Sequence, residues 1–210
     1  MTQPDYSPSA DRNKQPIVEV LRQFLPPQGR ALEIASGTGQ HIEWFAQQFP
    51  QWTWQPTEVH RGALYNIEVR VAQANLDNVL EAIQLDVRKF PWFPDTAPAP
   101  IFDLIFCANM LHISPWEACT ALMQGASRYL SAKGVLVTYG PYFETGMTPT
   151  QSNLEFDQSL RAHDSSWGIR ELDDVIRAAQ AAGLRLSAQH RMPANNLLLV
   201  FSALADNPAP

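Results

Sequence analysis

The sequence predicts an α/β protein with a doubly wound, mostly parallel seven-stranded sheet that ends in an antiparallel C-terminal hairpin. Short apolar runs alternate with longer helical patterns along the chain, which is typical of strands and helices built around a parallel sheet. A strand, a glycine turn and a helix over residues 31–49 have the form of a nucleotide-binding first crossover. The last two apolar runs, 184–192 and 197–203, are joined by a connection short enough to predict an antiparallel pair.

In the first half of the chain, apolar spacing separates the expected strands from the expected helices. Asn13 is expected to cap the first helix, with Pro16 in its first turn, where a missing N–H is harmless. Strands are expected at residues 31–34, 52–57 and 82–87, with helices after the Gly37-Thr38-Gly39 turn and over residues 61–74.

The second half contains a strong buried strand at residues 101–108, which is followed by a helix from Ser114 to Tyr129 and a strand at 134–139. Residues 141–170 then break the alternation, because they are polar, carry Gly and Pro, and exceed the length of a routine connection. Segments of this size are usually lids or binding elements, so we expect a lid insertion here. A helix at 171–182 leads into the hairpin.

The composition favours a single domain over residues 1–210, with frayed ends at 1–9 and 205–210. The net charge is −6 and no basic run is present, which argues against nucleic acid as a partner. No apolar stretch approaches the ~18 residues of a membrane helix, and the first residues do not resemble a signal peptide. Cys107 and Cys119 are too few for a disulfide framework, so we expect a cytoplasmic protein with no membrane partner.

Three carboxylates are expected at the carboxyl ends of neighbouring strands. Glu33 ends the first strand ahead of Gly37 and Gly39, glycines that would let a ligand approach the backbone closely. Glu58 ends the second strand, where a carboxylate can chelate ribose hydroxyls, and Asp86 ends the third, where it can accept from an adenine amine. Because such strand ends line one crevice, the ordered set predicts a nucleotide-type site.

This ordered set resembles that of the class I S-adenosylmethionine-dependent methyltransferases, which have a Rossmann-like fold with a terminal hairpin. The resemblance implies S-adenosylmethionine as cofactor, with Glu33 holding the methionine amine and Gly37 and Gly39 passing the methionine moiety. It further implies that Glu58 binds ribose, Asp86 binds adenine and Asn109 faces the sulfonium. One position departs from the pattern, since Ala35 stands where these proteins usually carry a glycine.

The sequence is also similar to the family of methyltransferase-like protein 26, which implies a fold and a cofactor but no substrate. The matching segments span most of the chain: residues 10–14, 39–41, 54–56, 109–115, 139–142, 151–153, 156–157, 167–170 and 192–196. Within this pattern, Asn13 and Lys14 are expected to cover the cofactor, although they could also simply cap and solvate the first helix.

The lid insertion supplies the candidate substrate residues. If residues 153–163 are helical, Asn153, Asp157 and Arg161 share one face. We expect Asn153 to act in catalysis, Tyr142, Arg161 and Trp167 to contact a small-molecule acceptor, and Asp157 or His112 to act as base. The alternatives are a solvated face with a surface ion pair for the helix, and a structural role for the histidine.

Three further expectations concern the chemistry. His41 is expected to be a packing residue, and the two cysteines to be buried thiols that lack zinc-ligand spacing, so we expect no metal. The fourth strand is not followed by Asp/Asn-Pro-Pro-Tyr, which disfavours a planar amine as the acceptor.

Two other functional classes stay open for this protein. One is a catalytically silent S-adenosylmethionine-binding module. The other is a nicotinamide dehydrogenase, which the absence of a third glycine at Ile42 and the terminal hairpin both disfavour.

Overall fold

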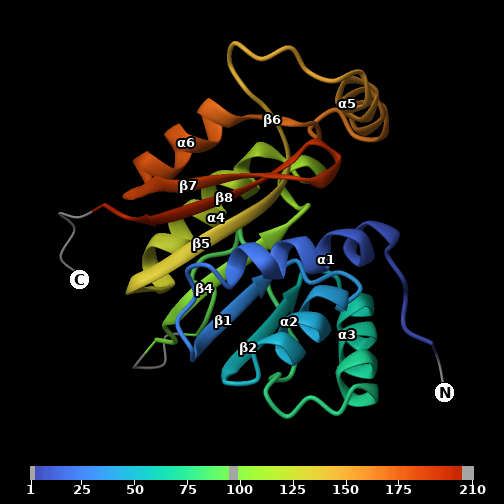
Figure 1. Cartoon of the computed structure of the whole chain (residues 1–210), viewed down its shortest axis with the longest axis vertical. Coiled ribbons are helices and arrows are strands. Elements are labelled where there is room, and N and C mark those ends of the chain that lie inside the picture. Colours follow the sequence, from blue (N-terminus) through green and yellow to red (C-terminus); the bar gives the residue numbers. More distant parts are fainter. Residues whose placement is uncertain (1–2, 95–98, 205–210) are drawn as a thin grey trace.

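The computed structural model describes residues 3–94 and 99–204 and consists of one sheet covered by helices on both faces (Figure 1). The strands are β1 (Gly29–Ile34), β2 (Trp52–Glu58), β3 (Ile83–Gln84), β4 (Phe102–Ala108), β5 (Leu130–Phe143), β6 (Arg170–Glu171), β7 (Leu184–Met192) and β8 (Asn196–Ala203). The α-helices are α1 (Pro8–Leu21), α2 (Gln40–Gln48), α3 (Arg61–Gln73), α4 (Trp116–Tyr129), α5 (Gln151–His163) and α6 (Leu172–Ala181).

The strand order is β3-β2-β1-β4-β5-β8-β7, and β6 pairs with β5 beside this path. The strands from β3 to β5 are parallel, whereas β8 runs antiparallel to both β5 and β7. This arrangement confirms the predicted fold class. The chain reverses its direction of travel across the sheet between β1 and β4, which is where open α/β sheets bind ligands beyond the strand ends.

Two apolar clusters hold the helices on the sheet. One packs α1 and α2 on one face, around residues such as Ile17, Phe45 and Trp54. The other packs α4 and α6 on the opposite face, around Leu122 and Val175. Because both faces of the central strands are covered, these strands read as continuous apolar runs in the sequence, and this is why their positions could be predicted.

The first helix begins earlier than the sequence suggested. It starts at Pro8, and the Ser7 hydroxyl accepts the cap hydrogen bond from the Ala10 N–H at 3.3 Å. The expected fraying through residue 9 is therefore wrong, as is the expected cap at Asn13, which lies buried within the helix. Pro16 accordingly lies in the helix interior. Residues 1–2 and 205–210, which were also expected to fray, lie outside the described residues.

The lid insertion is shorter than expected because β5 continues through Phe143. Tyr142 and Phe143 pair with Arg170 and Glu171 of β6, so residues 141–143 and 170 belong to the sheet. The insertion proper contains α5, followed by a connection over residues 164–169 that we call the strap. The third strand is also shorter than expected, at two residues. Within the described residues, no helix is both long enough and apolar enough to cross a membrane.

Candidate functional site

A cavity of about 540 Å³ lies at the carboxyl edge of the sheet, and we call it the edge cavity. Its walls come from the turn after β1, the ends of β2 and β4, the segment after β3, the start of α4 and the first turn of α1. Of the residues predicted for the cofactor, Gly37, Glu58, Asp86 and Asn109 line it, and Trp167 of the strap lines it as well.

The turn after β1 takes a left-handed backbone at alternate residues. The φ angles are 56° at Ala35, 55° at Gly37 and 75° at Gly39. A Cβ on Gly37 would meet nothing closer than 4.0 Å, so glycine serves the backbone conformation there and leaves the cavity open. A Cβ on Gly39 would lie 3.2 Å from the Ile67 Cα. The second glycine therefore permits α2 to pack on α3, and it does not line the edge cavity.

The Glu58 carboxylate is only 6% exposed and is held by main-chain N–H groups. One oxygen accepts from Gly37 at 3.0 Å, and the other accepts from Val59 at 2.8 Å and from His60 at 3.3 Å. These bonds fix the acid at the cavity wall in one orientation. An anchored carboxylate of this kind can accept hydrogen bonds from ligand hydroxyls without first having to be ordered.

Glu33 lies behind the turn and is 1% exposed. Its Oε2 has no hydrogen-bond partner among the described residues. Burial raises the pKa of this carboxyl to about 8, the Ser36 hydroxyl opposes the rise, and the Glu58 charge adds to it. The acid is therefore largely protonated at neutral pH, and a cation brought close to it would favour the charged form.

Asp86 forms an ion pair with Arg88, a residue that the sequence analysis did not single out. The Arg88 Nε and Nη2 each lie 3.0 Å from one oxygen of Asp86, and the Arg88 main-chain N–H donates to the first of these oxygens. The guanidinium lowers the pKa of Asp86. Both residues line the edge cavity, so a ligand amine that reaches Asp86 meets an acid already engaged on both oxygens.

Asn109 and His112 converge beside Gly140 of β5. Asn109 has a φ of 59°, and a Cβ on Gly140 would come within 3.3 Å of the His112 Nδ1 and 3.9 Å of the Asn109 Oδ1. Burial lowers the pKa of His112 to about 4, with a further contribution from Arg170, so its imidazole is neutral at neutral pH. The edge of the Phe156 ring covers it at a centroid distance of 5.4 Å.

His41 of α2 forms a further part of the cavity wall, where Asn13 of α1 contacts it. The His41 Nε2 lies 2.6 Å from the Asn13 Oδ1, and burial lowers the pKa of His41 to about 4. Because an amide oxygen only accepts, the neutral imidazole donates from Nε2 and keeps Nδ1 as an acceptor. His41 lines the edge cavity and Asn13 supports it from behind, whereas Lys14 pairs with Asp11 at 2.6 Å over the Trp44 ring and lines no part of the cavity.

The structure does not bring the predicted substrate residues together. Asn153 and Tyr142 line a separate hollow of about 170 Å³ beside the β7–β8 turn, and Arg161 lines a groove on the far side of the strap. The Tyr142 side chain is buried and its hydroxyl donates to the Thr138 Oγ1 at 2.8 Å, and its substrate contact stays a prediction. Of this set, only Trp167 reaches the edge cavity.

Asp157 braces the strap. One of its oxygens accepts from the Ile169 N–H at 2.7 Å, and the other accepts from the Arg161 Nε at 2.8 Å. With both oxygens engaged, the carboxylate acts as a structural anchor, which speaks against the predicted role as base. The Gly168 N–H also donates to the His112 carbonyl at 3.0 Å, so these contacts together set the position of Trp167.

Sequence reasoning missed the residues at the start of α1 that line the edge cavity, which are the N-cap Ser7 and the helical residues Ser9 and Ala10. The Ser-Pro step at residues 7–8 was the available signal, since Ser is a preferred cap and Pro a preferred first helical residue. Ser7 is placed by α2, because its main-chain N–H and C=O both bond the Gln40 side-chain amide. Within the described residues, no group of His, Cys, Asp and Glu side chains could hold a metal ion.

The strand order and the antiparallel β7–β8 pair give a Rossmann-like fold, with a cavity at the β1–β4 reversal, and this chain shares the fold with solved methyltransferases. The chain belongs to the family described as "Protein of unknown function (DUF938)", which it matches over residues 4–203. The similarity to methyltransferase-like protein 26 stays a prediction.

Solved structures with the same fold include three proteins with methyltransferase descriptions. The mitomycin 7-O-methyltransferase MmcR is 14% identical, with a TM-score of 0.76 over 92% of this chain and 54% of that one. CalO1, a methyltransferase in calicheamicin biosynthesis in its SAH-bound form, is 14% identical, with a TM-score of 0.72 over 93% and 54%. An O-methyltransferase family 2 protein from Planctomyces limnophilus DSM 3776, in complex with apigenin, is 16% identical, with a TM-score of 0.71 over 91% and 62%. The chain therefore spans little more than half the length of these proteins, and at such identities the likeness concerns the fold.

Proposed function

We propose that this chain binds S-adenosylmethionine in the edge cavity and transfers its methyl group to a small-molecule acceptor. One observation carries the proposal. Carboxylates end three adjacent parallel strands around one crevice, and two of them, Glu58 and Asp86, line a single cavity beside a left-handed glycine turn. This arrangement offers acceptors for ribose hydroxyls and for an adenine amine on neighbouring walls.

The residues around the turn fit this cofactor on two further counts. Glu33 has a buried, unpartnered carboxyl oxygen among the described residues, and a nearby ammonium group would compensate its charge. Gly37 leaves free space where any side chain would intrude into the cavity. Glu58, Asp86 and Asn109 would contact the cofactor directly. Glu33 lies behind the turn and would interact with the ammonium group through its charge.

When bound, the cofactor supplies a methyl group made electrophilic by the sulfonium. The chain's own contribution is to orient the bound ligand. Its anchored carboxylate at Glu58 would fix the ligand, and Asn109, which follows β4, lies near His112 beside Gly140. For an acceptor that must lose a proton, the neutral imidazole of His112 is the base that we favour over Asp157.

A small molecule is the acceptor class that we favour. The net charge of −6 gives no electrostatic attraction to a phosphate backbone, and the apigenin-bound protein from Planctomyces limnophilus is one neighbour with a small molecule. A cytoplasmic location and the kinship with methyltransferase-like protein 26 belong to the same proposal.

Isothermal titration calorimetry with S-adenosylmethionine, S-adenosylhomocysteine and NAD tests the cofactor. We expect the first two to bind at one site and NAD not to bind, since the buried Ile42 fills the position of the third dinucleotide glycine. Failure of both adenosyl ligands to bind would overturn the proposal.

A screen for S-adenosylhomocysteine formation against small hydroxyl, amine and thiol compounds then tests turnover. Product formed with any acceptor supports a methyltransferase. Tight cofactor binding without turnover across such a screen favours the silent binding module.

A further inference from the structure

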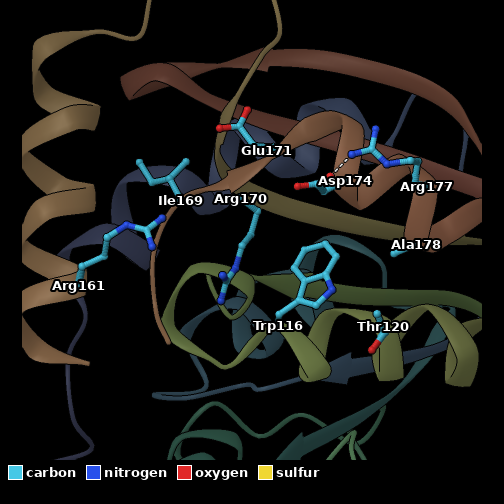
Figure 2. Close-up of a pocket in the computed structure, with 9 residues that line it drawn as sticks. All are labelled: Trp116, Thr120, Arg161, Ile169, Arg170, Glu171, Asp174, Arg177 and Ala178. Carbon is cyan, nitrogen blue, oxygen red and sulfur yellow. Dashed lines mark hydrogen bonds and ion pairs between the residues drawn. The ribbon is translucent and has the colours of Figure 1, made fainter. Parts of the chain in front are cut away.

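A groove of about 620 Å³ lies between α4, α5, β6 and α6, and it shares no lining residue with the edge cavity (Figure 2). We call it the arginine groove, because Arg161, Arg170 and Arg177 line it together with Trp116 and Ile169. The function proposed above makes no use of it.

Arg170 brings a partly buried positive charge to this groove, and no carboxylate among the described residues forms an ion pair with it. Its Nε donates to the Leu111 carbonyl at 2.9 Å, and its Nη2 donates to the carbonyls of Ser114 and Ser166. Its Nη1 has no hydrogen-bond partner in the same part of the chain. Neutral carbonyls orient a guanidinium but do not cancel its charge, so Nη1 of Arg170 remains a charged donor that is open to a ligand.

Arg161 reaches the same end of the groove from α5, and both guanidinium groups lie below the Ile169 side chain in the view of Figure 2. Its Nε is bonded to Asp157, while both of its Nη atoms are without a hydrogen-bond partner in the part of the chain that the structure describes. Gly168 makes room for this side chain, since a Cβ there would lie 2.6 Å from the Arg161 Nη2. The glycine of the strap is thus matched to the position of this arginine.

Two guanidinium groups and one adjacent carboxylate, that of Asp157, stand at this end of the groove. Burial lowers the pKa of Arg170 and the Arg161 charge lowers it further, whereas Cys119, Asp157 and Glu117 oppose the shift. Among the acids nearby, Asp157 is engaged by Arg161 and the Ile169 N–H, and Asp174 is paired with Arg177 on α6. Glu117 is exposed on α4, and Glu171 points away from the two guanidinium groups in Figure 2.

An apolar surface lies next to these donors. The Arg170 guanidinium carbon is 5.9 Å from the centroid of the half-buried Trp116 ring. We propose that Arg161 and Arg170 form a binding site for the carboxylate or phosphate group of a small molecule whose flat apolar body packs on Trp116. The free Nη1–Nη2 fork of Arg161 matches the geometry of both oxyanions, and Arg170 adds the single donor Nη1, which is the physical reason for this ligand class.

Titration calorimetry with benzoate and phenyl phosphate tests the site, with benzyl alcohol as the uncharged analogue. We expect saturable binding of at least one anion to the wild-type chain and none of the alcohol. Arg161→Gln should weaken binding about tenfold or more, because it removes a charged donor that faces the ligand. Arg191→Gln is the matched control, since it also removes a surface arginine that is paired with an acid, here Glu144, but Arg191 lies outside the groove.

Arg170→Gln should abolish binding, and Arg161→Gln keeps the test decisive if the Arg170 variant does not fold. Binding of benzoate alone identifies a carboxylate as the natural group, and binding of phenyl phosphate alone identifies a phosphate monoester. The proposal is overturned if neither anion binds, if benzyl alcohol binds equally well, or if Arg161→Gln and Arg191→Gln have the same effect.

Discussion

The Glu58 Oε2 accepts a hydrogen bond from the main-chain N–H of Gly37 at 3.0 Å, across 21 positions of sequence. One carboxylate therefore ends β2 and also holds the turn that follows β1. Because the turn and the acid form adjacent walls of the edge cavity, a single side chain sets both the shape of the cavity and its charge.

Replacement of this acid should weaken cofactor binding. We expect Glu58→Ala to weaken S-adenosylhomocysteine binding by roughly 1–3 kcal/mol, since a charged acceptor for ligand hydroxyls is lost and the turn loses its anchor. Calorimetry measures the change. Glu81→Ala is the control, because that side chain is exposed and lies outside the edge cavity. Equal affinities for the two variants would show that Glu58 is not part of the binding site.

Ala35 should tolerate glycine unusually well. A φ of 56° costs an L-residue roughly 1–2 kcal/mol of conformational strain. Glycine avoids this strain, but the unfolded chain is then more flexible, and folding costs roughly 0.5–1 kcal/mol more in backbone entropy. We therefore expect Ala35→Gly to leave the free energy of unfolding unchanged or to raise it by up to about 1 kcal/mol. Ala126 lies buried in α4, and in the same urea titration Ala126→Gly should lower the free energy of unfolding by about 1 kcal/mol or more. Similar losses in both variants would contradict the left-handed conformation at residue 35.

The unliganded protein should lose stability with rising pH through Glu33. The folded pKa of about 8 lies above the ordinary value of 4.5, so between these values the folded state keeps a proton that the unfolded state has released. Stability then falls as pH rises across this interval, by up to about 1.4 kcal/mol per pH unit.

Glu33→Gln should remove this contribution, because its amide does not titrate. Denaturant unfolding of both proteins across the interval isolates the effect as the difference between the two pH profiles. Parallel profiles would mean that the Glu33 carboxyl is not protonated in the folded state.

Trp167 should contribute to cofactor affinity, while its neighbours in the insertion should not. We expect Trp167→Ala to weaken S-adenosylhomocysteine binding about fivefold or more, since it removes an aromatic wall of the edge cavity. Asn153→Ala should change the affinity by less than about threefold, because Asn153 lines the separate hollow beside the β7–β8 turn. The reverse order of effects would show that α5, rather than the strap, closes over the cofactor.

Much of the fold followed from local patterns. Strand β4 carries a near-continuous apolar run because both of its faces are buried, and a three-residue connection leaves β7 and β8 no arrangement other than antiparallel. Boundaries were less predictable. Asn13 has the chemistry of a cap, but Ser7 is the residue that the Gln40 side chain holds in place, and no local pattern contains that contact.

The sequence by itself determined that Glu33, Glu58 and Asp86 lie near one edge of the sheet, since parallel strands deliver their carboxyl ends to the same edge; Glu58 and Asp86 line the edge cavity there, and Glu33 lies behind the turn. Only the tertiary structure decided which neighbours each acid has. The bond of Glu58 to the Gly37 N–H and the isolation of Glu33 depend on how groups pack across elements distant in sequence. The same holds for the insertion, where helical spacing placed Asn153 and Arg161 on one face of α5 but left open which hollow each would line. That choice depends on how α5 docks on the strap and the hairpin, and long-range contacts of this kind leave no periodic signal in the sequence.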